Sequence, residues 1–588
     1  MKERHILIAF MIILAVAAVF RFWNLTGPDM LGDDAHYSLR ALGYFDYAGS
    51  LNTQTTPIVW FSEPVWWQKL SFHDAPPLVF AVQCFFFQMF GDTVFAARLP
   101  FVLAGLLTVF GMYLLGKELT GKAGVGLIAA GMLAVSNYHV WLSRIGLLDG
   151  FVFLWVIFAL YFFLRAERNS KYYLWWGICC GLGLLTKYTF IFMGPLFLVL
   201  IFVLRRRALR EPRFWIGLGL CLLLLVPIII YNVMVWRTRG HFDAALSTMV
   251  GQSPDDFRGL TRSVNTDIFR GMWVVIQSIA KKVSPAFRVL FPMGIIVGGW
   301  AMARVRGRRA LLLVTLGFLF AVPMLALAGG SAHYDIVVFP FVLLAAGMGG
   351  WMLWEHARKS MWSRIVVACI AGAAFLWEGF FMVQSGFVPA PWIPHPFFVE
   401  AARSPWLGYN HLDAYVREFY RKYPDPSYII FSKTPQIFNY QLKKTQRLYD
   451  RGENRPQQAH LLVYDNRMDW TPAVWTFERR RLYEVAAIPS LTNLIDAVDG
   501  DYIYKFLEFG FTDVTVILAT DRVPYNQALD VARLSRFAER IEAALRPIDE
   551  IKNDNGEVAF RVFQFRLDDA IRLFGNGQDA TVKNNETL

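Results

Sequence analysis

Charged residues are scarce in this sequence. They make up 18% of its 588 residues, whereas 55% are hydrophobic, and a soluble globular chain carries about 25% charged residues. The chain is long enough for several domains, and the hydrophobic cores of soluble domains cannot account for so low a share of charged residues. The composition therefore excludes a wholly soluble protein and predicts that most of the chain lies in a membrane.

Cysteines are also few. There are five, all of them lie in apolar stretches, and none occurs in the more polar last third of the chain. We therefore expect neither a disulfide framework nor a thiolate metal site.

A continuous basic face is missing as well. The net charge of +12 would suit a nucleic acid ligand, but Lys and Arg form short clusters between apolar runs. Nucleic acid is therefore not an expected partner.

The sequence does contain eleven apolar runs. A helix needs roughly 17–25 apolar residues to cross a bilayer, and the runs are near this length, although several are short. They lie at about 6–23, 99–115, 124–142, 147–164, 172–186, 188–204, 214–231, 289–302, 310–328, 334–354 and 363–383. We expect a mainly α, polytopic helical bundle of about eleven transmembrane helices. The alternative for the first run is a cleaved signal peptide, since Ala15-Val16-Ala17 resembles a cleavage site.

Basic clusters occupy every second connection between these runs. They are Lys2/Arg4, Lys117/Lys122, Arg165/Arg168/Lys171, Arg205/Arg206/Arg207/Arg210/Arg213, Arg304/Arg306/Arg308/Arg309 and Arg358/Lys359/Arg364. Because positive loops stay in the cytoplasm, the amino terminus is expected inside and everything after about residue 384 outside. The chain is thus expected to be a multi-pass protein of the plasma or inner membrane.

The last 200 residues change character. Apolar runs shorten to strand length at 428–431, 461–464 and 514–518, with helical patterns such as 411–422 and 526–545 between them. We predict three parts: a membrane domain at 1–385, a linker at 386–397, and a soluble extracytoplasmic α/β domain at 398–588. The first outer loop, 24–98, contains an apolar stretch from Pro76 to Phe90 that is too short to span and is predicted to lie in the interface.

Ionisable groups near the apolar runs gather at their outer ends. Charges close to hydrocarbon are costly and usually functional, so these positions are candidates for a site. A transporter or flippase, the less favoured alternative, would be expected to place such groups near the midplane on broken helices. A non-catalytic scaffold would leave the clustered carboxylates unexplained.

Two candidates lie in the first outer loop. The adjacent carboxylates of Asp33 and Asp34 can accept a proton from a nucleophile or help to bind a divalent cation; the alternative is a solvated loop pair. His73 and Asp74 could form a metal pair, or simply a polar entry to a helix that begins with proline.

Further candidates follow in later outer loops. Asp149 and Arg144 lie together in the second outer loop, where the alternative to a functional role is a helix-capping Asp and a snorkelling Arg. Lys187 stands in an outer turn, where a Lys is disfavoured unless it has a partner such as phosphate. His333-Tyr334 could join such a site or belong to an aromatic interfacial belt.

Taken in order, these pieces form a pattern. They are Asp33-Asp34-x-x-Tyr37, Pro76-Pro77-Leu78, Gly91, Arg98-Leu99-Pro100, Ser143-Arg144 with Asp149, Leu185-Thr186-Lys187, and His333-Tyr334 with Pro340. Their order and common outer placement resemble the C superfamily (GT-C) of membrane glycosyltransferases. Within it the chain is most similar to the protein O-mannosyltransferase and lipid A aminoarabinose transferase group, glycosyltransferase family 39-like. The resemblance covers roughly residues 5–385.

The resemblance implies transfer of a sugar, with inversion, from a polyprenyl-phosphate donor to a lipid, glycan or protein acceptor on the outer face. It implies catalytic roles for Asp33, Asp34 and Asp149, with Asp33 as the base or as the residue that orients the acceptor. Arg144, Lys187, His333 and Tyr334 are implied to bind the donor phosphate, and a divalent metal ion is left open. The chain departs from the family pattern at Asp34, where Glu is usual, and at Ala75, where the aminoarabinose transferases carry Lys. An oligosaccharyltransferase or ligase is the main alternative enzyme.

Overall fold

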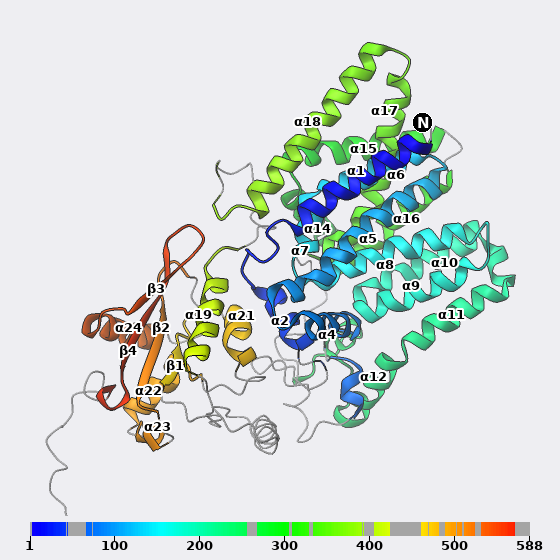
Figure 1. Ribbon diagram of the computed structural model, residues 1–588. Helices are drawn as coiled ribbons and strands as arrows, with labels where there is room; N and C mark the ends of the chain where they lie inside the picture. Colours follow the sequence, from blue (N-terminus) through cyan, green and yellow to red (C-terminus); the bar gives the residue numbers. More distant parts are fainter. Residues whose placement is uncertain are drawn as a thin grey trace, which may run out of the picture.

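Most of the chain is described by the computed structural model shown in Figure 1. The described residues are 3–42, 44, 66–72, 74–255, 267–304, 308–327, 333–390, 392, 405–423, 460–468, 470–480, 488–500, 503–508, 511–523 and 531–570. Helices form the larger body, and a small sheet with its own helices lies to one side of it.

The larger body consists of helices. They are α1 (Glu3–Phe22), α2 (Gly32–Leu42), α4 (Leu78–Phe90), α5 (Val94–Thr120), α6 (Ala123–Val135), α7 (Asn137–Arg144), α8 (Leu148–Arg165), α9 (Tyr172–Thr186), α10 (Met193–Leu204), α11 (Pro212–Leu224), α12 (Val226–Arg239), α13 (Ala244–Met249), α14 (Ile268–Lys282), α15 (Pro285–Arg304), α16 (Arg308–Leu327), α17 (Phe339–Ala357) and α18 (Met361–Gly386). Short 3-10 turns accompany them at η1 (Trp66–Leu70), η2 (Tyr188–Phe192), η3 (Arg206–Arg210) and η5 (Tyr334–Val338).

All eleven predicted apolar runs are helical, so the predicted mainly α membrane bundle is confirmed. Within the described ranges, six helices are long and apolar enough to cross a membrane, or eight if the bent pairs α6–α7 and α11–α12 each count as one. The other three runs form shorter apolar helices, Tyr172–Thr186, Tyr188–Leu204 and Pro285–Ala301. The number of crossings therefore stays a prediction.

Close helix contacts depend on a few glycines. A Cβ on Gly177 of α9 would lie 1.9 Å from the carbonyl oxygen of Gly217 in α11, and one on Gly116 of α5 would lie 2.8 Å from Cα of Gly126 in α6. In lipid there is no hydrophobic driving force between helices, so van der Waals packing holds them together. Small residues such as these glycines let the backbones approach closely enough for that packing.

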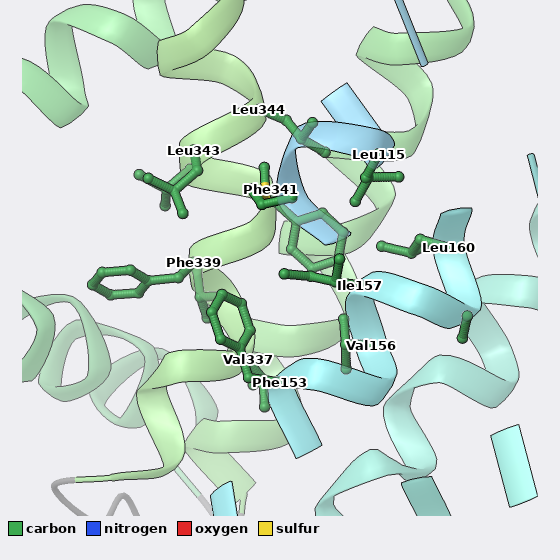
Figure 2. Packing of buried hydrophobic residues seen from close by; sticks show 14 of the residues in the cluster. Leu115, Phe153, Val156, Ile157, Leu160, Val337, Phe339, Phe341, Leu343 and Leu344 are labelled. Atoms are coloured by element: carbon green, nitrogen blue, oxygen red, sulfur yellow. The ribbon is translucent and has the colours of Figure 1, made fainter. Parts of the chain in front are cut away.

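The centre of the bundle is a densely packed apolar core. Figure 2 shows side chains from α5, α8 and α17 meeting there, among them Leu115, Ile157 and Phe341, all fully buried. The same core includes Phe153 near the start of α8 and Val337 of η5. Because interiors are close-packed and resist deformation, this core holds the polar residues that begin α8 and η5 in defined positions.

The C-terminal part contains one four-stranded sheet among the described residues, in the order β1-β2-β4-β3. Its strands are β1 (His460–Tyr464), β2 (Asp513–Ala519), β3 (Asp549–Lys552) and β4 (Val558–Arg566), and only β1 and β2 pair in parallel. Its helices are α19 (Tyr409–Lys422), α21 (Trp470–Ala473), α22 (Leu491–Asp499), α23 (Tyr504–Glu508) and α24 (Val531–Ala544), with a π-helical turn η7 (Val474–Glu478) and a 3-10 turn η9 (Leu567–Asp569).

Most of the C-terminal predictions can be compared with this sheet. The predicted strands 461–464 and 514–518 are confirmed, as is the helix at 411–422; the pattern at 526–545 is helical from Val531 onward, and residues 526–530 and the predicted strand 428–431 lie outside the described residues. Strands β3 and β4 were not predicted. In β4 the buried residues lie on both faces, which leaves little period-2 signal, and β3 has only 4 residues, of which Ile551 alone is buried.

The C-terminal part docks on the first outer loop (Figure 1). The carboxylate of Asp29 accepts hydrogen bonds from the backbone N–H groups of Leu407, Gly408 and Asn410, at 2.5, 3.0 and 2.8 Å, at the start of α19. Burial raises the pKa of this carboxylate, while these hydrogen bonds oppose the rise. Trp475 of η7 is buried in the same apolar cluster as Phe87 of α4.

Candidate functional site

The site centres on the carboxylate of Asp33, in the first turn of α2. Its side chain is 42% exposed, and its Oδ2 lies 3.7 Å from Nε2 of His333, which precedes η5. The same imidazole nitrogen lies 3.6 Å from Oδ2 of Asp149, whose side chain is only 1% exposed. His333 therefore connects an accessible carboxylate with a buried one.

A buried cation lies beneath this pair. Nζ of Lys187 is 2.7 Å from Oδ2 of Asp149 and 4.1 Å from the ring centroid of Tyr334. Burial lowers the pKa of Lys187, but the charges of Asp149, Tyr334 and Asp33 outweigh it and leave the pKa above its ordinary value. Lys187 is therefore protonated, and its charge is directed into the site.

The backbone explains how Lys187 reaches this position. It is the single extended residue, at φ −164° and ψ 141°, between the end of α9 and the turn η2. A residue in that conformation interrupts the helical run, so its side chain turns inward instead of lying along a helix surface.

His333 is a neutral group at neutral pH. Burial lowers its pKa, the carboxylates of Asp149 and Asp33 oppose this, and the nearby charge of Lys187 adds to the lowering. A neutral imidazole has one nitrogen that donates and one that accepts a hydrogen bond. It can therefore orient a neighbouring carboxylate without adding a second fixed positive charge.

Two further residues of α2 lie on the face of Asp33, and the sequence reasoning assigned neither a role. Tyr37 interacts electrostatically with Asp33, Asp74 and Tyr334, and burial raises its pKa, so it stays a neutral hydroxyl donor. Arg40, one turn further on, pairs with Asp74 at 2.6 Å. Their spacing in the sequence could have indicated this position. Tyr37 and Arg40 follow Asp33 by four and seven residues, which places all three on one helix face.

The proposed metal pair receives no support from this arrangement. Asp74 is engaged by Arg40, and His73 lies outside the described residues. Among the residues that the structure describes, no group of three or more His, Cys, Asp or Glu side chains is placed to hold a metal ion.

Asp34 lies outside the cluster, in spite of its position next to Asp33. It is buried, its Oδ2 accepts hydrogen bonds from Nε and Nη2 of Arg98 at 2.9 and 2.8 Å, and its Oδ1 accepts one from the backbone N–H of Gly146 at 2.8 Å. A Cβ at Gly146 would lie 2.6 Å from that Oδ1, so the close approach requires glycine. Asp34 thus links α2 to α5 and to the loop before α8.

Arg144, like Asp34, holds neighbouring segments of the chain together. Its guanidinium donates to the carbonyl oxygens of Phe20, Trp23 and Asn24 at 3.0, 2.5 and 2.9 Å, and it lies 4.3 Å from the ring centroid of Phe387. In the structure the terminal nitrogens of Arg144 bind backbone carbonyl oxygens at and just after the end of α1, and its predicted contact with a donor phosphate stays a prediction. Its contacts hold the segment that leads to Asp33.

Another buried ion pair lies next to the site. Nζ of Lys282, at the end of α14, lies 2.5 Å from Oδ2 of Asp335, and both side chains are almost fully buried. Since Asp335 follows His333 and Tyr334 by one or two residues, the pair anchors η5 against α14. The sequence reasoning missed Lys282, which only an amphipathic pattern in 268–282 could have suggested.

One family model matches part of the chain. Residues 74–231 match the family model described as dolichyl-phosphate-mannose-protein mannosyltransferase. That segment includes Asp149 and Lys187 but ends before His333 and begins after Asp33. No curated protein matches the sequence.

Solved structures resemble the whole chain. The crystal structure of ArnT from Cupriavidus metallidurans in the apo state superposes with a TM-score of 0.52 at 14% identity, covering 96% of this chain and 98% of that chain. The same protein bound to undecaprenyl phosphate gives 0.51 at 14% identity, with coverages of 94% and 97%. The oligosaccharyltransferase of Archaeoglobus fulgidus tethered with an acceptor peptide gives 0.50 at 12% identity, covering 87% of this chain and 69% of that chain.

The apolar helices and the overall fold define a multi-pass membrane protein that shares the fold of ArnT and of the oligosaccharyltransferase. The chain has the fold of the GT-C superfamily of membrane glycosyltransferases, as its motifs predicted.

Proposed function

We propose that this protein transfers a sugar from a polyprenyl-phosphate donor to an acceptor hydroxyl or amine on the outer face of the membrane, with inversion. The observation that carries the proposal is an accessible carboxylate, Asp33, held within 4 Å of a neutral imidazole, above a buried lysine paired with Asp149. This combination supplies a proton acceptor and a cation to one reaction.

The chemistry assigns a role to each residue. The acceptor heteroatom bonds to the anomeric carbon while Asp33 takes its proton, and the bond from that carbon to the phosphate oxygen breaks with its electron pair remaining on the phosphate. Lys187 stabilises the charge that develops on the leaving phosphate. His333 and Tyr37 orient Asp33, and Asp149 orients Lys187.

A lipid-linked donor suits this location better than a nucleotide sugar. Nucleotide sugars are cytoplasmic, whereas the cluster lies at the ends of helices predicted to be outside. The description of the matching family model names dolichyl-phosphate-mannose. One structure with a similar fold, ArnT, was solved bound to undecaprenyl phosphate. An oligosaccharide in place of a single sugar remains the second candidate, because the oligosaccharyltransferase shares the fold.

The proposal is tested by mass spectrometry of membrane lipids and surface glycans from cells with and without the protein. We expect loss of one glycan mass increment and accumulation of the matching polyprenyl-phosphate sugar. An increment of several sugars would identify the oligosaccharide alternative, and unchanged lipid and glycan profiles would contradict the proposal.

We also propose the orientation and the division into domains. The amino terminus is cytoplasmic in the plasma or inner membrane, residues 1–385 form the membrane domain, 386–397 the linker and 398–588 the extracytoplasmic domain. The alternation of basic clusters supports the orientation, and the separate core of the sheet supports the division.

A reporter that is active only outside the cytoplasm is expected to be active when fused after Val399 and inactive when fused within 304–309, since that stretch is a basic cluster. Fusion expression is controlled by immunoblotting. Activity of the 304–309 fusion would overturn both the orientation and the outer location of the site.

A further inference from the structure

The segment between α1 and α2, residues 23–31, leads directly to Asp33 and contains no helix or strand. Asp29 and Met30 of this segment are nevertheless almost fully buried. Buried carbonyl oxygens that take part in no helix or sheet need other hydrogen-bond donors. The conformation of residues 23–31 therefore depends on groups that come from elsewhere in the chain.

Two arginines of the helical body bind part of this segment. Arg144 binds carbonyl oxygens near the end of α1, as described above. The guanidinium of Arg98 donates to the carbonyl oxygens of Leu25, Pro28 and Asp29, each at 2.9 Å. These contacts hold the segment from the side of α5 and α7.

Asn410 of the C-terminal part, in the first turn of α19, binds the same segment. Its Nδ2 lies 2.8, 3.0 and 2.8 Å from the carbonyl oxygens of Thr26, Gly27 and Pro28. Three acceptors around one atom identify that atom as the donor nitrogen of the amide, whose two protons the carbonyl oxygens share. One side chain therefore holds three consecutive residues of the segment.

Asp29 makes the reciprocal contacts. Its carboxylate accepts the three backbone N–H groups at the start of α19, where the first amides of a helix have no intrahelical partner and the helix dipole favours an anion. Its own N–H donates to the carbonyl oxygen of Pro405 at 2.9 Å. Nearby, Leu31 packs against the apolar cluster that contains Leu412 of α19. The C-terminal part thus holds the residues that directly precede α2.

The C-terminal part also packs on α2 itself. Both α21 and η7 contact α2, and Trp475 of η7 shares an apolar cluster with Ala35 and Ala41 of α2. Asp33, the second residue of α2, lies 3.7 Å from Nε2 of His333, slightly beyond the usual length of a hydrogen bond. Misplacing a reacting group by about 1 Å can cost about 100-fold in rate, so the position of α2 matters for Asp33.

We infer that the C-terminal part sets the position of Asp33 and that Asn410 is a positioning residue for this carboxylate, an inference that rests on the proposed function for the role of Asp33. Asn410 acts through residues 26–28 and the start of α2, and not on the substrate. Contact between the two parts of the chain is thereby coupled to the rate of the reaction.

The test variant is Asn410→Ala in the purified full-length chain. The side chain is partly exposed and Ala favours a helix, so α19 is preserved while the contacts to residues 26–28 are lost. We expect kcat for sugar transfer to fall about tenfold and KM for the donor to change less than about twofold, because a displaced base slows the reaction without weakening donor binding. Backbone amides of residues 23–31 should exchange hydrogen faster.

Asn466→Ala is the matched control. The side chain of Asn466 exchanges two hydrogen bonds with Thr492 inside the C-terminal part, at 2.8 and 3.2 Å. Its removal should leave kcat and the hydrogen exchange of residues 23–31 unchanged.

A double-mutant cycle with Asp33→Asn separates positioning from general damage. In that background, Asn410→Ala should change transfer less than about twofold. An equal loss in both backgrounds, an equal loss in Asn466→Ala, or unchanged kcat or hydrogen exchange in Asn410→Ala would each overturn the inference. Wild-type transfer by Asp33→Asn would instead refute the proposed role of Asp33, an outcome that hydrogen exchange distinguishes because it needs no donor.

Discussion

Asp33→Asn is expected to reduce sugar transfer at least about a hundredfold, since general-base contributions are typically about 10²–10⁴-fold. Asn is nearly isosteric with Asp, so packing and membrane insertion should be preserved. The side chain is partly exposed and engages only the imidazole of His333 among the described ion pairs. Initial rates are measured on purified protein with a polyprenyl-phosphate sugar at saturating acceptor.

The neighbouring carboxylate provides a contrast within the same motif. Asp34→Asn leaves Arg98 buried without its counter-charge, and breaking a buried pair costs about 3–5 kcal/mol. We therefore expect Asp34→Asn to lower the free energy of unfolding, and to reduce transfer per folded molecule less than Asp33→Asn does. Thermal unfolding and rates of both variants separate the two effects.

An exposed carboxylate far along the chain serves as the matched control. Asp568→Asn makes the same chemical change at a 51% exposed side chain after β4, and it should leave transfer unchanged. Near-wild-type transfer by a correctly inserted Asp33→Asn protein would refute the base assignment. A larger rate loss in folded Asp34→Asn would assign the base to Asp34.

Lys187→Met is expected to lower kcat/KM for the donor by about 10- to 150-fold. The reason is the loss of one charge-assisted contact to the leaving phosphate, worth about 1.5–3 kcal/mol. Lys187 is the buried cation nearest to Asp149 among the described residues, at 2.7 Å. Its removal should affect the donor dependence and leave the KM for the acceptor nearly unchanged.

Folding must be separated from catalysis in this variant, because Asp149 loses its partner as well. Lys187→Arg keeps the positive charge and should recover a substantial part of the activity. Asp149→Asn combined with Lys187→Met removes both charges and should restore stability without restoring donor use. An unchanged kcat/KM for the donor in Lys187→Met would leave Lys187 with a purely structural role.

Local properties of the sequence sufficed for much of the architecture. Hydropathy is summed over neighbouring residues, and each of the eleven apolar runs is helical. Local chemistry also accounts for helix ends that the sequence analysis did not assign: Gly121, with φ +68°, ends α5, and the side chain of Thr93 caps its start. The short apolar runs of β1 and β2 identified a sheet in the last third.

The candidates for the site were likewise found from their position along the chain. Asp33, Asp149, Lys187 and His333 each lie at or beyond the end of an apolar run, and the structure brings them together. Charge is costly in hydrocarbon, so helices that share an orientation deliver their polar ends to one surface. The spacing alone therefore indicated the face on which the site lies.

The sequence by itself thus determined the membrane class and the helices, and it identified the polar residues near the ends of the apolar runs as candidates. Only the tertiary structure decided that Asp34 binds Arg98 while Asp33 faces His333, that Arg144 holds the end of α1, and that β4 lies between β2 and β3. Each of these partners is distant along the chain, and adjacent residues on a helix point in different directions. A charged side chain can stabilise the fold or take part in the reaction. Which of the two it does depends on the partner that folding places next to it.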